Sequence, residues 1–232
     1  METLPKQAQV VIIGGGVIGC SVAYHLTKLG WSDTVLLERK ELTCGTTWHA
    51  AGLIGQLRPT KNMTMLAQYT CELYTKLEEE TGQATGFKQN GSISVAPNKE
   101  RFEELKRGAS MAKCFGLEVE VITPREAVEM HSLLNIDDLE GAVFLPKDGQ
   151  INPIDVTQAL AKGAKIGGAR IFEGVKVSGI KTIKGRTVGV KTDQGDIASE
   201  IVVNCAGLWG REVGLMAGVN VPLFAAEHFY IV

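Results

Sequence analysis

Cysteine, aromatic side chains and excess charge of one sign are all scarce in this chain. Its 232 residues include five cysteines, 6% aromatic residues and a formal net charge of −2. The cysteines are scattered, with no Cys-x-x-Cys pair and no paired histidines, so we expect neither a disulfide framework nor a metal site. The near-neutral charge argues against nucleic acid or an anionic membrane as a partner. A small-molecule ligand and a reducing compartment fit these absences.

Long hydrophobic runs are missing as well. No apolar stretch approaches the length that spans a bilayer, and only a short polar lead, residues 1–9, precedes the first apolar segment. We therefore expect no membrane span, signal peptide or Arg-rich transit segment, and a cytoplasmic protein of the bacterial type. The alternative is the mitochondrial matrix, with a presequence removed. The apolar content of 44% is ample for a buried core.

A glycine-rich loop between an apolar run and a helical pattern is the most informative feature present. Residues 14–19 read Gly-Gly-Gly-Val-Ile-Gly, and the helical pattern covers 17–29. Gly14 allows a tight turn, Gly16 lets a pyrophosphate approach the backbone, and Gly19 lets helix and strand pack closely. The helix N-terminus adds free N–H donors. The pattern predicts a dinucleotide cradle made by Gly14, Gly16, Val17, Ile18 and Gly19.

An acidic residue follows the next predicted strand, 34–37. Glu38 lies about 20 residues beyond Gly19, where dinucleotide-binding folds place the carboxylate that accepts hydrogen bonds from the ribose. A ligand-free turn and a solvated strand end are the structural alternatives. The order of strand, loop, helix, strand and acid favours the binding interpretation over both.

The rest of the chain alternates helical and strand patterns. Residues 42–59, rich in Gly and Thr, predict an extended loop or short helix that touches a ligand. Hydrophobic spacing and capping signals predict helices over 63–77, 102–112, 123–126, 153–164 and 208–217, strands at 93–95 and 201–203, and a β-meander over 171–197.

Two further strings identify a family. Residues 43–53 read Thr-Cys-Gly-Thr-Thr-Trp-His-Ala-Ala-Gly-Leu, and 204–209 read Asn-Cys-Ala-Gly-Leu-Trp. With the glycine loop and Glu38, they resemble the flavin amine dehydrogenases related to D-amino-acid oxidase, and look most like the dimethylglycine and sarcosine dehydrogenases. The resemblance covers nearly the whole chain in order.

The resemblance implies FAD, held covalently by His49 at the flavin 8α-methyl. A neutral imidazole is a competent nucleophile, and the tether raises the oxidising power of the flavin. The resemblance also implies that Glu38 and Arg39 lie at the adenosine end and that Val177 touches adenine. The remaining cofactor contacts that it implies are Gly45, Thr46, Thr47, Trp48, Ala50, Ala51, Gly52 and Leu53 along the pyrophosphate and ring, with Gly207 and Trp209 over the cofactor.

The implied reaction is the transfer of a hydride equivalent from an N-methyl carbon to flavin N5. The resulting iminium gives formaldehyde or passes one carbon to tetrahydrofolate. His228 and Tyr230 alternate on a predicted final strand, where they could position the amine or take its proton; an ordinary aromatic-rich strand is the alternative. Arg58 is a candidate for the substrate carboxylate or a plain surface residue.

The expected fold class is α/β (α+β), a Rossmann-like FAD-binding domain with a parallel sheet and a β-meander, plus part of an inserted mixed-sheet substrate domain. We expect FAD-binding segments at 1–82 and 151–221, a substrate-domain segment at 83–150, and a returning substrate-domain strand at 222–232. The chain looks like the N-terminal fragment of a longer enzyme, with any tetrahydrofolate site beyond residue 232.

Three other functions stay open. The protein could be an FAD oxidoreductase of another secondary amine or amino acid. It could be a non-catalytic regulatory protein resembling the regulatory subunit of pyruvate dehydrogenase phosphatase, or an NAD-dependent Rossmann protein. The electron acceptor, a flavoprotein or oxygen, is not specified by any motif.

Overall fold

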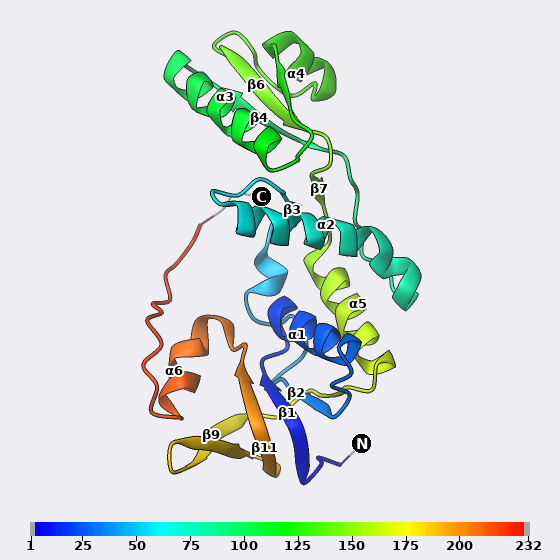
Figure 1. The fold of residues 1–232 in the computed structure, drawn as a ribbon, viewed down its shortest axis with the longest axis vertical. Coiled ribbons are helices and arrows are strands. Elements are labelled where there is room, and N and C mark those ends of the chain that lie inside the picture. The colour runs from blue at the N-terminus through cyan, green and yellow to red at the C-terminus, as the bar shows by residue number, and fades with distance from the viewer. Residues whose placement is uncertain (1–2, 230–232) are drawn as a thin grey trace. The chain divides into compact units, whose positions relative to one another are not determined.

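The computed structural model describes residues 3–229, which divide into two compact units (Figure 1). Unit 1 contains the chain up to Ala51, Leu77–Thr85 and the residues from Pro153 on, and unit 2 contains Gly52–Lys76 and Gly86–Asn152. The chain crosses between the units after residues 51, 76, 85 and 152, whereas boundaries at 82 and 150 were expected. Residues 52–76 group with unit 2, where the short strand Leu53–Ile54 pairs with Gly149–Gln150.

Unit 1 is built on a six-stranded sheet with the order β8-β2-β1-β11-β10-β9. Strands β8, β2, β1 and β11 are parallel to one another, and β10 is antiparallel to both of its neighbours, β11 and β9. This confirms the α/β class with a parallel sheet. The strands are β1 (Gln7–Ile13), β2 (Thr34–Leu37), β8 (Arg170–Phe172), β9 (Val177–Ile183), β10 (Arg186–Thr192) and β11 (Gly195–Asn204).

The β-meander differs from its prediction at both ends. Its expected first strand, around Ile171, is β8 and lies beside β2 in the parallel part. Its expected last strand and the separate strand 201–203 are one element, β11, which pairs with β10 at its start and with β1 along most of its length. Ile201 is 39% exposed, so residues 201–203 are not covered on both faces. Lys184 and Gly185, which both have positive φ, form the hairpin turn between β9 and β10.

Two helices pack side by side in unit 1: α1 (Val17–Lys28) and α5 (Pro153–Ile166). They approach closely at Gly163, where an added Cβ would lie 2.7 Å from Cδ2 of Tyr24. Val11 and Val35 of the sheet belong to a different buried apolar cluster, which includes Val213. The remaining pieces are the 3-10 turns η1 (Thr47–His49) and η2 (Gly207–Trp209), the short helix α6 (Gly210–Leu215) and the last turn of α2 (Lys61–Thr81).

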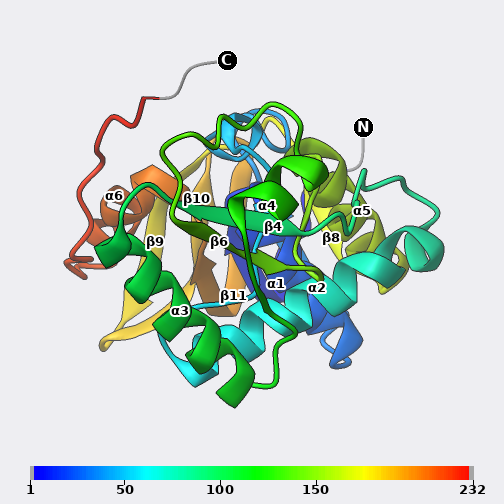
Figure 2. The same cartoon turned by 90° about the horizontal axis from the view of Figure 1, so that it is seen from above.

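Unit 2 is a small helix–sheet–helix sandwich (Figure 2). Its antiparallel sheet has the order β4-β6-β5. Ala109 and Ala112 of α3 pack with Val143, whereas Ala127 of α4 packs with Ala142, so the two helices cover opposite faces. The elements are β3 (Leu53–Ile54), β4 (Ser92–Ala96), β5 (Glu120–Ile122), β6 (Gly141–Leu145), β7 (Gly149–Gln150), α3 (Lys99–Cys114), α4 (Pro124–Met130) and the first part of α2.

Local signals predicted several of these elements well. The capping box before α4 is present, since the Thr123 hydroxyl accepts from Glu126 N and the Glu126 carboxylate accepts from Thr123 N. The predicted final strand, 222–232, does not appear over its described part, because residues 219–229 form neither strand nor helix. A strand needs a hydrogen-bonded neighbour, and Phe224 and Phe229 are 87% and 85% exposed. Tyr230 lies outside the described residues.

We expect the Tyr24 phenol to make the free energy of unfolding depend on pH in the alkaline range. Its buried phenol donates to Glu80 Oε2 at 2.9 Å, and burial, followed by this hydrogen bond, raises its pKa from 10.0 to about 12. A raised pKa in the folded state means that this stabilisation is complete below pH 10 and is lost as the pH rises through 12. Tyr24→Phe should cost about 1 kcal/mol at pH 8 and flatten the decline. Urea unfolding of both proteins at pH 8 and pH 11 measures this, and an unchanged decline would contradict it.

Candidate functional site

The glycine loop adopts a backbone that side chains would block. Gly14 has φ +113, and a Cβ there would lie 2.3 Å from the Cys205 carbonyl oxygen. A Cβ on Gly19 would lie 1.9 Å from the Gly14 carbonyl oxygen. The turn and the helix–strand packing therefore both require glycine, for the reasons expected from the sequence.

The N-terminus of α1 is open to an anion. Gly16 is its N-cap and has no side chain to accept from the helix, and no acidic residue occupies the first turn. Val17 N donates to the Thr47 hydroxyl at 3.1 Å, and a Cβ on Gly16 would lie 3.0 Å from that oxygen. Ile18 is 64% exposed. The first-turn amides and the helix dipole thus face a cradle that a larger residue than glycine would fill.

Glu38 is fixed at the rim of this cradle. It follows β2, its Oε2 accepts from Gly15 N at 2.7 Å, and its Oε1 accepts from Lys40 N at 3.0 Å. Cys44 Sγ lies 3.8 Å from Oε1. An ionised carboxylate can accept about four hydrogen bonds, so Glu38 keeps capacity for ribose hydroxyls while its own position is held by the chain.

The loop after Glu38 is anchored from two sides. Glu173, directly after β8, accepts from Leu42 N at 2.6 Å, and Gly174 N donates to Lys40 O at 2.8 Å. Thr43 N donates to Gly15 O at 3.0 Å, with Thr43 itself at φ +72. A β-branched residue rarely adopts this conformation, so surrounding contacts enforce it. Sequence reasoning missed Glu173; its signal was an acid at the end of the third parallel strand.

The string 43–53 forms a short turn rather than a packed element. Its 3-10 turn η1 buries Thr47, leaves Trp48 51% exposed and leaves His49 exposed. The Trp48 and His49 rings are 3.7 Å apart. Among residues 3–229 no cluster of His, Cys, Asp and Glu could hold a metal ion. Ala50 and Ala51 complete the part of the string in unit 1, and Gly52 and Leu53 begin unit 2.

Three other predicted cofactor contacts, Gly207, Trp209 and Val177, also lie in unit 1. Gly207 has φ +55, and a Cβ there would lie 3.9 Å from the Thr46 hydroxyl. Trp209 stacks on Arg39, with Cζ 3.9 Å from the ring centroid. Val177 is buried at the start of β9. The structure thus brings the glycine loop, Glu38, the string and the 204–209 segment together, whereas His228 is exposed on a segment without secondary structure.

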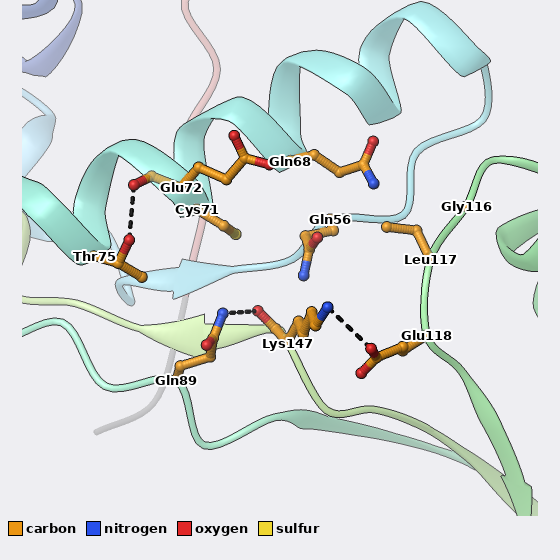
Figure 3. Close-up of a pocket in the computed structure, with 10 residues that line it drawn as sticks. All are labelled: Gln56, Gln68, Cys71, Glu72, Thr75, Gln89, Gly116, Leu117, Glu118 and Lys147. Atoms are coloured by element: carbon orange, nitrogen blue, oxygen red, sulfur yellow. Dashed lines mark hydrogen bonds and ion pairs between the residues drawn. The ribbon is translucent and has the colours of Figure 1, made fainter.

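Unit 2 has a polar pocket of its own, of about 260 Å³ (Figure 3). Gln56, Cys71 and Leu117 are its buried members, and Lys147 pairs with Glu118 at 3.0 Å at its edge. Burial raises the pKa of the Cys71 thiol to about 11, which leaves it protonated and unreactive at neutral pH. This pocket therefore offers no activated nucleophile.

Arg58, the other candidate from the sequence, lies in unit 2 near a buried acid. A Cβ on Gly55 would be 3.5 Å from both Arg58 Nη1 and Asp148 Oδ2. Asp148 is buried and accepts from Gln56 N and from the Ser92 hydroxyl, at 2.8 and 2.6 Å. The Arg58 guanidinium itself donates from Nη1 to Leu57 O at 2.9 Å.

We expect cysteine labelling to map the cradle. Cys44 is exposed beside Glu38, and Cys114 is exposed in unit 2, while Cys20 is buried with its pKa raised to about 12 by burial and by Glu38. Iodoacetamide at pH 8 should modify Cys44 and Cys114 but not Cys20 or Cys71. Bound dinucleotide should slow labelling of Cys44 alone, with Cys114 as the internal control. Equal slowing of both, or labelling of Cys20, would contradict this, as read by peptide mass spectrometry.

The cradle, the carboxylate after β2 and the third parallel strand define unit 1 as a dinucleotide-binding unit of the Rossmann type. Its residues fit FAD: the open helix N-terminus suits a pyrophosphate, and Glu38 suits the ribose. The family described as FAD dependent oxidoreductase (DAO) matches residues 9–232. The chain belongs to this family of FAD-dependent oxidoreductases.

Known relatives agree. The chain is 46% identical to human mitochondrial sarcosine dehydrogenase over 99% of its length. It is 42% identical to rat mitochondrial dimethylglycine dehydrogenase over 97%, and 44% identical to the mouse mitochondrial pyruvate dehydrogenase phosphatase regulatory subunit over 98%. It spans 26% of each of these relatives. These similarities confirm the resemblance inferred from the strings.

A solved structure shares the fold. L-proline dehydrogenase from P. horikoshii superposes with a TM-score of 0.88 at 32% identity, over 93% of this chain and 57% of that one.

None of the helices within 3–229 has the length and apolarity needed to cross a membrane.

Proposed function

We propose that the protein is an FAD-dependent amine dehydrogenase or oxidase that acts on an N-methylated glycine, dimethylglycine or sarcosine. The observation that carries this is the glycine cradle with Glu38 at its rim, in a chain 46% identical to a sarcosine dehydrogenase. FAD, when bound, supplies a two-electron acceptor for the hydride equivalent lost from the N-methyl carbon.

The chain's own residues would bind this cofactor along the edge of the parallel sheet. Gly14, Gly16 and Gly19 let the backbone approach the pyrophosphate, and the first-turn amides of α1 donate to it. Glu38 would accept from the ribose hydroxyls, as its fixed carboxylate beside Gly15 supports. Arg39, Val177 and the segments 45–53 and 207–209 complete the proposed cofactor contacts.

His49 is the proposed site of covalent attachment. Its imidazole is exposed on η1 and belongs to no metal-binding cluster within residues 3–229, so it is free to act as a nucleophile. For the amine, we propose that His228 and Tyr230 orient it or take its proton. The two proposed compartments are the cytoplasm and the mitochondrial matrix, and the sarcosine and dimethylglycine dehydrogenase relatives, which are named mitochondrial, favour the second.

The test uses the full-length protein made with ample riboflavin. We expect a yellow protein that oxidises sarcosine or dimethylglycine with an artificial electron acceptor, in a panel that includes proline and glycine betaine. Turnover of proline alone would move the proposal to another secondary amine. A colourless protein without turnover would reject it. Assays with oxygen, a flavoprotein acceptor and tetrahydrofolate then separate the remaining partners.

A regulatory function is the second candidate. The chain is 44% identical to the mouse pyruvate dehydrogenase phosphatase regulatory subunit, and this identity, which favours a regulatory function, is close to the 46% identity to sarcosine dehydrogenase. A regulatory protein would show no turnover of any amine in the panel, whether or not it binds flavin. Turnover therefore discriminates the two candidates.

A further inference from the structure

One aromatic ring contacts both ends of the loop that leads to the flavin string. The Arg39 guanidinium lies over the face of the Trp209 indole, 3.9 Å from its centroid. At the other end of the loop, the Cβ position of Gly45 lies 3.6 Å from Cζ3 of the same indole. The loop 39–45 therefore closes around Trp209.

Hydrogen bonds within residues 204–210 hold the turn that carries Trp209. The Asn204 amide donates to Gly210 O at 2.7 Å and accepts from Ala206 N at 3.2 Å, which spans the turn that carries Trp209. Cys205 N donates to Ile13 O at 2.8 Å and joins this turn to β1. These hydrogen bonds connect the turn that carries the indole to the central sheet.

The far end of the loop lies between two anchors. Leu42 and Thr43 are held by Glu173 and by Gly15, and Thr47 is held by its hydroxyl, which accepts from Val17 N at 3.1 Å. Gly45 lies between these anchors, beside the Trp209 indole. His49 N donates to Thr46 O at 3.3 Å, so a displacement at Gly45 would act on the start of η1.

We propose that Arg39 and Trp209 form a latch that positions the loop 39–49 for cofactor capture, and that Trp209 acts through this loop. In this latch both are positioning residues, in addition to the cofactor contacts proposed for them above. An exposed cation stacked on an indole loses little solvation, and the stack leaves the in-plane guanidinium donors directed away from the ring. The inference rests on the proposed function, because it concerns how the same cradle takes up FAD.

The test is a double-mutant cycle in the full-length protein. A His49→Ala background keeps FAD binding reversible, and flavin fluorescence gives the dissociation constant. We expect Arg39→Met and Trp209→Leu each to weaken FAD binding about two- to five-fold, as loss of an exposed cation–π contact implies. The double variant should be no weaker than the weaker single variant, while Arg39→Lys and Trp209→Phe should recover most of the affinity. Arg211→Met, which removes an exposed charge nearby, is the control.

Hydrogen exchange of the FAD-free protein supplies an independent readout. Amides 44–49 should exchange faster in Arg39→Met and Trp209→Leu, with no change in Arg211→Met. Multiplicative losses in the cycle, or unchanged exchange and affinity in Arg39→Met, would overturn the latch while leaving FAD binding intact. If the parent protein binds no FAD, the proposed function fails instead, and the exchange rates still decide whether the latch exists.

Discussion

Replacement of Gly19 by alanine is expected to destabilise unit 1 by at least about 3 kcal/mol and to abolish flavin retention. The new Cβ would lie 1.9 Å from the Gly14 carbonyl oxygen, a backbone atom. Gly14 cannot retreat, because its N–H donates to Leu37 O at 2.9 Å and its other side abuts the Cys205 carbonyl. Urea unfolding and the flavin-to-protein absorbance ratio measure the two effects.

Gly30→Ala is the matched control for this substitution. Gly30 has φ +89 with no atom within 4 Å of its Cβ position, so alanine there meets only the conformational cost of about 1 kcal/mol. Flavin retention should stay normal. If Gly19→Ala were no more destabilising than Gly30→Ala, the close packing of α1 on the loop would not be a requirement of the fold.

Replacement of His49 by alanine is expected to remove acid-stable flavin completely. In the wild type, precipitation with acid should leave the flavin in the protein pellet, since a bond to the imidazole survives unfolding. In His49→Ala the flavin should pass into the supernatant, because the proposed bond is lost with the imidazole ring. His131→Ala, at an exposed position in unit 2, should behave as the wild type.

Two results would contradict the His49 assignment differently. Flavin that stays with the His49→Ala pellet would place the bond on another residue. Flavin that leaves the wild-type pellet would show that the cofactor binds without a bond, while the cradle and the amine oxidation would stand.

Local signals in the sequence predicted the elements that local chemistry controls. The Gly-rich loop, the periodic apolar residues of α1 and the Thr123–Glu126 capping box act within a few residues, and each appears where expected. The strand predicted at the end of the chain does not appear in its described part, for the opposite reason. Its alternating aromatic pattern resembles a strand, yet residues 219–229 have no neighbouring strand to pair with in the described structure.

By itself, the sequence determined the α/β class, the dinucleotide cradle and the family, because short-range steric and capping rules and a long shared string are written in consecutive residues. The tertiary structure alone decided that β8 joins the parallel sheet, that Glu173 anchors the loop after Glu38, and that Arg39 stacks on Trp209. Such contacts join residues more than a hundred positions apart. Only the folded sheet brings these residues together, since no local preference encodes the pairing.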